Sequence, residues 1–214
     1  MLNLPPDAFD KYDDESDEIF YEMPRFVTHI DDRAITAVTQ LYRERFPAGG
    51  DLLDLMSSWV SHLPSEATYG SVVGLGMNDE ELAANPRLTE RIVQDLNQNP
   101  ILPFANAMFD GAAICVSIQY LTRPVEALKE VVRVLRPGAP LVITFSNRCF
   151  PTKAVMAWQM LDDKGHVSLV EQYMQQTGFV DIISLDRSPE RWGSDPLYAV
   201  IGMSAGTNIA LDSS

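Results

Sequence analysis

The chain has 214 residues, with 16 basic and 30 acidic side chains and a net charge of −14. This length suits one α/β domain with a substantial core, and the negative charge disfavours DNA, RNA or an anionic membrane as the main partner. No apolar run approaches the roughly 18 residues of a membrane span, so no membrane insertion is expected. The first residues lack the basic and apolar regions of a signal peptide.

The two cysteines, Cys115 and Cys149, lie in apolar, strand-like surroundings. We interpret them as reduced thiols of an intracellular protein rather than as a disulfide, and therefore expect a cytoplasmic location. The histidine and cysteine spacings indicate no zinc site, so no metal is predicted. The sequence does not indicate an oligomeric state.

Residues 1–23 form an acidic lead-in that contains two prolines. Such a composition favours irregular structure, but the aromatic residues Phe20 and Tyr21 predict that this segment docks on the body of the protein. Residues 31–46 are predicted to be a helix, because their apolar side chains recur with a period of 3.6 and an aspartate pair can cap the first turn.

The next stretch, DLLDLMSSWVSHLP, predicts a ligand site. Residues 51–55 are expected to form a buried strand around one carboxylate, Asp54. A short helical segment is then expected to begin at Ser57 or Ser58 and to end by Pro64. A strand, a turn and a helix start in this order form the place where open α/β sheets bind nucleotide-like ligands, because the first helical N–H groups attract anions.

The remaining elements alternate along the chain. Strands are predicted at 71–75, 91–95, 111–117, 141–145, 180–185 and 196–203, and helices at 79–84, 124–135, 152–161 and 166–176. Continuously apolar strands separated by helices favour a parallel sheet covered on both faces, and the short link before the last strand favours an antiparallel pair. The expected fold is a Rossmann-like, doubly wound, mostly parallel seven-stranded α/β sheet in one domain (24–205), followed by a frayed tail (206–214).

Three segments resemble the class I S-adenosylmethionine-dependent methyltransferases, and in particular the methyltransferase type 11-like, small-molecule branch that includes the ubiquinone and menaquinone C-methyltransferases. These segments are LLDL at 52–55, VQDLNQNPILPFANAMFDGAAICVSIQYL at 93–121 and ALKEVVRVLRPGAPLVITFSNR at 127–148. The third is the most specific, because its helix ends in Leu-Arg-Pro-Gly before the next strand. Together the resemblance covers residues 51–148.

The resemblance implies S-adenosyl-L-methionine as the cofactor and a small molecule as the acceptor. The implied cofactor-binding residues are Asp54, Met56, Ser57, Ser58, Gly76, Asn78, Asp95, Leu96 and Ser117. Asp54 either orients the ammonium group of the methionine portion or caps its own turn. Asp95 either accepts a hydrogen bond from the adenine amino group or caps a turn, and Leu96 offers a backbone N–H to the ring.

The chain departs from the family pattern at two places. The glycines that normally let the backbone approach the ligand are replaced by Met56, Ser58 and Val60. The acidic residue that normally holds both ribose hydroxyls is replaced by Gly76, and the nearby Asn78 binds a hydroxyl less well than a carboxylate does. The chain therefore either binds the cofactor by a modified route or has lost it.

No catalytic group is predicted with a defined role. The candidates are His62, Tyr120 and Arg148, and for each of them an ordinary surface or hydrogen-bonding role is the alternative. Tyr21, Arg25 and His29 are spaced by four residues and would share one face of a helix, which favours a lid over the cleft.

The sequence suggests three alternative functions for the chain. The leading one is a methyltransferase that acts on a small molecule. The alternative is a non-catalytic relative that binds a metabolite or a protein partner, because the glycine turn is altered and fold alone does not determine function. A dinucleotide-dependent oxidoreductase is disfavoured, since no G-x-G-x-x-G follows the first strand.

Overall fold

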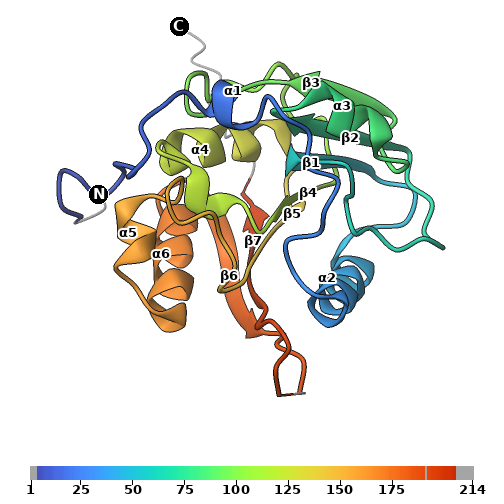
Figure 1. Cartoon of the computed structure of the whole chain (residues 1–214). Helices are drawn as coiled ribbons and strands as arrows, with labels where there is room; N and C mark the ends of the chain where they lie inside the picture. The colour runs from blue at the N-terminus through green and yellow to red at the C-terminus, as the bar shows by residue number, and fades with distance from the viewer. Residues whose placement is uncertain (1–3, 191, 206–214) are drawn as a thin grey trace, which may run out of the picture.

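The structure is a computed structural model that describes residues 4–190 and 192–205 (Figure 1). Its strands are β1 (Asp51–Ser57), β2 (Ser71–Gly76), β3 (Glu90–Val93), β4 (Gly111–Cys115), β5 (Pro140–Phe145), β6 (Phe179–Asp186) and β7 (Tyr198–Ser204). Its α-helices are α1 (Asp17–Phe20), α2 (Asp32–Arg45), α3 (Asp79–Ala84), α4 (Pro124–Val134), α5 (Met156–Gln159) and α6 (Asp163–Gln175). The predicted tail at 206–214 lies outside the described residues.

The strands form one seven-stranded sheet in the order β3-β2-β1-β4-β5-β7-β6. The pairs among β1 to β5 are parallel, whereas β7 runs antiparallel to both β5 and β6. The predicted fold class, including the antiparallel pair at the end, is confirmed. The strand order reverses between β1 and β4, and in open α/β sheets ligands bind at such a switch point.

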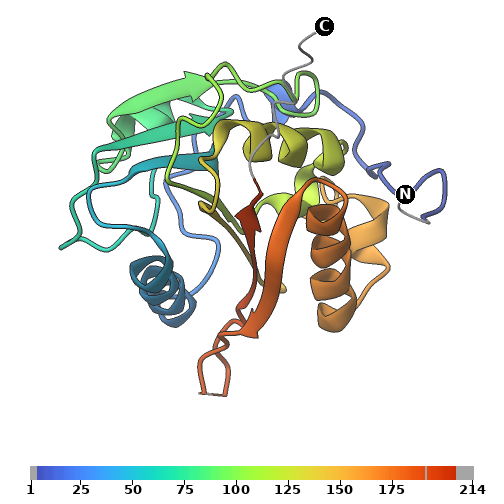
Figure 2. The ribbon, with the colours of Figure 1, turned by 180° about the vertical axis from the view of Figure 1, so that it is seen from behind.

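Alternate strand residues face two different layers. Leu53 and Leu55 of β1 belong to the larger core cluster with α4 and α6, whereas Leu52 belongs to the second cluster with α2. Figure 1 and Figure 2 show α2 on one side of the sheet and α4, α5 and α6 gathered on the other. Both faces of the sheet are therefore covered, as continuously apolar strands require.

The two most regular helical patterns are confirmed. The Asp31 carboxylate caps α2 by accepting hydrogen bonds of 2.9 Å from the N–H groups of Arg33 and Ala34. Pro124 occupies the first turn of α4, where its missing N–H costs nothing.

Two later helix predictions need correction. The predicted helix at 152–161 is helical only over Met156–Gln159. The helix predicted at 166–176 begins earlier, at Asp163, because Asp162 caps it by accepting a 2.8 Å hydrogen bond from the N–H of Gly165. Gly165 therefore lies inside α6 and does not separate two helices.

The predicted helical segment at 57–64 is wrong. β1 continues to Ser57, which pairs with Gly76, and no helix occurs over 58–70. Met56 has a φ of 56°, and the register is irregular between Leu55 and Ser57. The hydroxyls of Ser57 and Ser61 both donate 2.6 Å hydrogen bonds to the Asp54 carboxylate. These local bonds compete with a helix.

The segment after β1 still covers the sheet, although it is not helical. Leu63 is buried in the cluster with α2, and Tyr69 packs against that cluster. The Asn85 side chain donates 2.9 Å hydrogen bonds to the Ser58 carbonyl and the Ser61 hydroxyl. Side-chain packing and polar cross-links thus replace the helix that is usual after the first strand.

The last residue of β2 has to be glycine. A Cβ added to Gly76 would lie 2.2 Å from the carbonyl oxygen of Ser57, a backbone atom that cannot move independently of β1. At Gly74, by contrast, the nearest atom to an added Cβ is the side-chain Cδ1 of Leu88 at 2.4 Å. The backbones of β1 and β2 therefore approach closely at the end of this strand.

We predict that Gly76→Ala lowers the free energy of unfolding by about 3 kcal/mol, since overpacking against rigid backbone lies at the high end of its usual range. Gly74→Ala serves as the matched control and should cost about 1–2 kcal/mol, because Leu88 can change rotamer. Urea unfolding curves measure both. Equal losses would contradict the rigid contact at Ser57.

The N-terminal arm, residues 4–29, is docked on the body of the protein. Ala8 is buried in the larger core cluster, and its carbonyl accepts a 2.8 Å hydrogen bond from the N–H of Ala157. The arm then crosses the carboxyl ends of the strands before it enters α2 (Figure 1). The prediction that Tyr21, Arg25 and His29 share a helix face is wrong, because the helix in this region ends at Phe20.

Candidate functional site

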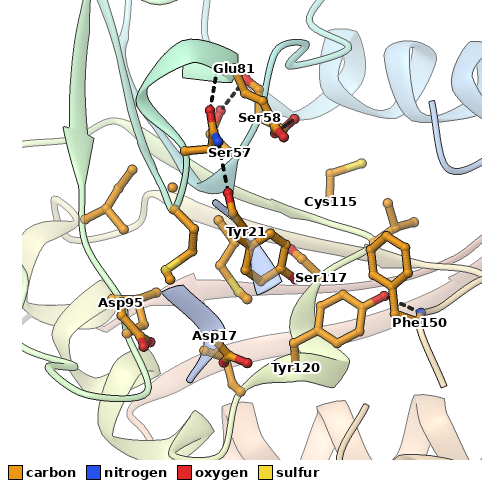
Figure 3. Close-up of a pocket in the computed structure, with 18 of the residues that line it drawn as sticks. Asp17, Tyr21, Ser57, Ser58, Glu81, Asp95, Cys115, Ser117, Tyr120 and Phe150 are labelled. Atoms are coloured by element: carbon orange, nitrogen blue, oxygen red, sulfur yellow. Dashed lines mark hydrogen bonds between the residues drawn. The ribbon is translucent and has the colours of Figure 1, made fainter. Parts of the chain in front are cut away.

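A cavity of about 290 Å³ lies at the carboxyl ends of β1, β2 and β4 (Figure 3). It is lined from below by residues at or just beyond these strand ends, including Ser57, Gly76 and Ser117. The N-terminal arm closes it from the other side, with Tyr21 and Arg25 among the lining residues. The cavity therefore occupies the switch point of the sheet, under a cover supplied by the same chain.

The structure brings together all of the predicted cofactor residues except Asp54. Those that line the cavity are Met56, Ser57, Ser58, Gly76, Asn78, Asp95, Leu96 and Ser117. Of the catalytic candidates, Tyr120 and Arg148 line it and His62 does not. Tyr21, Arg25 and His29 line it as well, although they are not on a helix.

Asp54 and His62 occupy structural positions. The Asp54 carboxylate is buried beneath the turn and binds the hydroxyls of Ser57 and Ser61. Burial raises the pKa of Asp54 to about 6. His62 has a φ of 53°, and its carbonyl accepts a 2.9 Å hydrogen bond from the Thr39 hydroxyl. Burial lowers the pKa of His62 to about 4, so its ring is neutral at pH 7.

At the end of β2, two polar residues bind the arm. The Asn78 oxygen caps α3 by accepting a 3.0 Å hydrogen bond from the Glu81 N–H, and its amide donates to the carbonyls of Tyr21 and Glu22. The buried Glu81 carboxylate accepts a 2.5 Å hydrogen bond from the Ser58 hydroxyl and a 2.7 Å one from the Arg25 N–H. Both side chains thus connect the sheet to its cover.

Beyond β3, Asp95 caps the following turn. Its Oδ1 accepts hydrogen bonds from the N–H groups of Asn97 (2.7 Å) and Gln98 (3.4 Å). The sequence predicted Asp95 as the last residue of this strand, but the strand ends at Val93 and Asp95 lies two residues beyond it. Asn97 donates a 2.9 Å hydrogen bond to Asp17 of the arm, which also lines the cavity.

Beyond β4, the chain places hydroxyl and thiol groups at the cavity. Ser117 is 9% exposed, and its hydroxyl has no hydrogen-bond partner within the part of the chain that the structure describes. The Tyr120 hydroxyl accepts a 2.8 Å hydrogen bond from the N–H of Phe150 (Figure 3), and burial raises the pKa of Tyr120 to about 12. Cys115 lines the cavity with a pKa raised by burial to about 11, so it is a thiol at pH 7.

The arm supplies an aromatic wall. Phe20 packs edge-on against Phe150 with ring centroids 5.2 Å apart, and the Arg25 guanidinium lies 4.4 Å from the Phe20 ring centre. The ring of His29 contacts Phe150 at 5.2 Å, and burial is the main cause that lowers the pKa of His29. Because the pKa of His29 is lowered from its ordinary value, its imidazole is neutral at pH 7.

A buried lysine holds the arm in place. Lys153 is 1% exposed, and its ammonium lies 3.2 Å from Asp13 Oδ2, 3.6 Å from Asp17 Oδ1 and 2.7 Å from the carbonyl oxygen of Glu15. Its charge is therefore neutralised by arm residues. Since a buried charge needs such partners, the closed arm is the arrangement that this lysine favours.

Sequence reasoning missed several residues of the site. Glu81 lies in a run of acidic residues and has no feature that separates it from its exposed neighbour Glu80. Asp17 belongs to an equally acidic stretch. Phe150 follows a polar turn after β5, and only the fold brings it to Tyr120.

Comparison with known proteins gives a match to a family model described as a methyltransferase domain, over residues 57–143. Over 42 residues the chain is 52% identical to the ubiquinone/menaquinone biosynthesis C-methyltransferase UbiE of Roseobacter denitrificans, a match that covers 20% of this chain and 17% of that protein. Over 138 residues it is 29% identical to the biotin biosynthesis bifunctional protein BioHC of Cellvibrio japonicus, covering 59% of this chain and 27% of that protein. The matches thus span well under two thirds of these relatives.

Solved structures show the same fold at low sequence identity. The [4+2]-cyclase SpnF has a TM-score of 0.58 and 16% identity, with 79% of this chain and 81% of that chain covered. Phosphoethanolamine N-methyltransferase 2 of Haemonchus contortus, solved in complex with S-adenosyl-L-methionine, has a TM-score of 0.56 and 16% identity, with 79% and 52% covered. Residues 57–143 thus match the methyltransferase domain model, and most of the chain shares the fold of these class I methyltransferase-like structures. The resemblance noted in the sequence is confirmed.

Within residues 4–190 and 192–205, no three His, Cys, Asp or Glu side chains are grouped so that they could hold a metal ion. In the same described ranges, no helix has both the length and the apolar character to cross a membrane.

Asp54 should make the stability of the protein depend on pH. Its pKa is about 6 in the folded protein against an ordinary value of 3.8, so between these values the folded state holds more protons than the unfolded state. The contribution of Asp54 to stability therefore falls as pH rises through this window. Asp54→Asn does not titrate. Its free energy of unfolding relative to wild type should rise by up to about 3 kcal/mol between pH 4 and pH 7. Urea unfolding at several pH values tests this, and a constant difference would contradict it.

A further prediction concerns the arm. Lys153→Met removes the buried charge that binds Asp13 and Asp17, and should lower the free energy of unfolding by roughly 3 kcal/mol. Amide hydrogen exchange should accelerate in residues 13–29 more than in the sheet. The control is Lys164→Met, which changes an exposed lysine. Unchanged protection of the arm in Lys153→Met would show that other contacts hold it.

Proposed function

We propose that this chain binds S-adenosyl-L-methionine in the cavity and transfers its methyl group to a small-molecule acceptor. The observation that carries the proposal is the convergence of eight predicted cofactor positions on one cavity at the switch point. These positions were chosen from the sequence, and they come from the ends of β1, β2, β3 and β4. The curated relatives named above include a C-methyltransferase, which supports the same activity.

The proposed orientation follows from the polar groups. The adenine ring would lie beside Asp95 and Leu96, because Asp95 Oδ2 accepts no hydrogen bond from the described residues. The methionine portion would extend toward Met56 to Ser58. The sulfonium would then approach Ser117, whose unpartnered hydroxyl has room for a hydrogen bond to the ligand.

In methyl transfer, the acceptor atom attacks the methyl carbon in line with the carbon–sulfur bond, and S-adenosylhomocysteine leaves. Positioning supplies much of the rate in such a reaction. Tyr120 remains protonated at neutral pH, so it orients an acceptor as a hydrogen-bond donor and does not act as a base. The neutral His29 can take a proton from an acceptor that carries one.

The acceptor we propose is a small, flat, apolar or aromatic molecule. The cavity is close to the lower end of the usual size range for ligand sites, and Tyr21, Tyr120 and Phe150 line it. A cytoplasmic location belongs to the same proposal, supported by two free cysteines.

A second candidate is a non-catalytic protein that binds a metabolite or a partner. The arm favours it, because the carbonyls of Tyr21 and Glu22 already bind Asn78 in the cavity wall. The missing helix after β1 favours it too, since the anion-binding N–H groups of that helix start are absent. One structural neighbour is a [4+2]-cyclase, which is consistent with other uses of this fold.

Calorimetric titration with S-adenosylhomocysteine separates the two candidates. We predict micromolar binding to the wild-type chain and about tenfold weaker binding to Asp95→Ala, because one hydrogen bond to the adenine amino group is lost. Asp79→Ala is the control, since its carboxylate pairs with Arg91 on the surface.

No heat of binding to a protein with a cooperative melting transition would overturn the methyltransferase proposal. Equal affinities of Asp95→Ala and wild type would remove Asp95 from the adenine site and leave the activity proposal standing.

A further inference from the structure

Two arginine side chains line the cavity of this strongly acidic protein. They are Arg25 of the arm and Arg148, which follows β5, and no lysine among the described residues lines the cavity. The chain carries a net charge of −14, so the molecule as a whole repels small anions. An anionic ligand therefore needs a local cationic group, and these two guanidinium groups supply it.

Arg148 is fixed through one edge of its guanidinium group. Its Nε donates a 2.7 Å hydrogen bond to Oδ1 of Asp195, whose side chain is 9% exposed. Asp195 is fixed in turn, because its Oδ2 accepts a 3.0 Å hydrogen bond from the N–H of Asp31. Neither terminal nitrogen of Arg148 bonds to any residue that the structure describes. The N–H groups on these two nitrogens are therefore open to a ligand.

Arg25 adds a positive charge that no carboxylate of the described residues pairs with. Its terminal nitrogens donate to the main-chain carbonyls of Phe20 (2.8 Å) and Met23 (3.4 Å). The guanidinium also lies 4.4 Å from the Phe20 ring centre and 5.7 Å from the Phe150 ring centre. Glu81 accepts its hydrogen bond from the main-chain N–H of Arg25 and not from the guanidinium. The charge of Arg25 is therefore available to a ligand near Phe150.

The acidic residues of the cavity lie toward its other side. Asp95 follows β3, and Glu81 lies in α3, which follows β2. In the strand order β3-β2-β1-β4-β5, these elements are on one side of the switch point and Arg148, beyond β5, is on the other. Asp17 of the arm is already paired with Lys11 at 2.6 Å. The cavity is thus acidic at its β2 and β3 side and cationic at its β5 side.

The β5 side is also where an acceptor would lie beside the proposed cofactor. With the adenine beside Asp95 and the sulfonium near Ser117 after β4, the next strand end in the sheet is that of β5. Tyr120 and Phe150 line the cavity there, with ring centroids 6.0 Å apart. A flat acceptor that packs against these rings is close to Arg148 as well.

We infer that the methyl acceptor carries a carboxylate, which binds the two terminal nitrogens of Arg148, while its flat apolar or aromatic part packs against Tyr120 and Phe150. This inference deepens the proposed function and rests on it for the position of the acceptor. A planar carboxylate matches the guanidinium fork and accepts two parallel N–H···O hydrogen bonds from it. Arg25 supplies a second positive charge from the arm. Arg148 is thus a specificity-determining residue for the acceptor.

The test compares a carboxylate with its neutral isostere. Benzoate and benzamide are titrated into the protein with and without saturating S-adenosylhomocysteine, and NMR chemical shifts give the dissociation constants. Wild type with S-adenosylhomocysteine should bind benzoate about 10- to 100-fold more tightly than benzamide, as expected for hydrogen bonds between charged groups. Arg148→Gln should lose most of this preference and bind benzamide as wild type does.

The matched control is Arg123→Gln. Arg123 is also paired with a carboxylate, that of Glu126, but it does not line the cavity, so this variant should keep the wild-type preference. Arg148→Lys keeps the charge without the fork and should bind benzoate more weakly than wild type. Arg25→Gln leaves the pair of Arg148 and Asp195 intact and should also weaken benzoate binding. Thermal melting confirms that each variant is folded.

The outcomes separate this inference from the proposed function. If wild type binds S-adenosylhomocysteine but binds benzoate no more tightly than benzamide, or binds neither, the carboxylate is overturned and the cofactor proposal survives. If wild type prefers benzoate through Arg148 but does not bind S-adenosylhomocysteine, the carboxylate site stands and the methyltransferase proposal is overturned. An unchanged preference in Arg148→Gln would remove Arg148 from the site. Tighter binding of phenyl phosphate than of benzoate would contradict the assignment to a carboxylate.

Discussion

The contact between the carbonyl of Ser57 and the last residue of β2 determines the shape of this site. β1 continues in extended form to Ser57 and lies directly against Gly76, so that even a Cβ at position 76 would meet backbone at 2.2 Å. This contact excludes an acidic residue at the end of the second strand, and the extended course of β1 takes the place of the usual glycine-rich turn into a helix. The cavity is therefore built from other groups.

The polar groups of the site come from other positions than is usual in this fold. Asp54, in the buried part of β1, accepts hydrogen bonds from Ser57 and Ser61 and stabilises the irregular turn. Hydrogen bonding toward the cavity instead comes from α3, through Glu81, and from the arm. The arm is more than a cover, because Lys153 neutralises its acidic residues from within the body. Glu81 and Asn78 both line the cavity and bind the arm, so a ligand in the cavity would meet the side chains that hold the arm.

The regular parts of the fold could be predicted because each rests on local pattern. The period of α2, the proline at the start of α4 and the continuously apolar strands specify those elements, and their alternation favours a mostly parallel sheet. The segment after β1 was mispredicted, since its structure depends on hydrogen bonds between Asp54 and two serines rather than on periodicity. The cavity residues at the strand ends were predictable, because the carboxyl ends of parallel strands meet at one edge of the sheet. Glu81 and Phe150 were not, because only tertiary contacts distinguish them from their neighbours.

The central claim is that this rebuilt cavity accepts an adenosine joined to an amino acid. A crystal structure of the protein grown with S-adenosylhomocysteine tests it most directly. The account predicts the adenine beside Asp95 and Leu96, the sulfur near Ser117 and the arm closed over the ligand. A structure in which the ligand lies outside this cavity would contradict it.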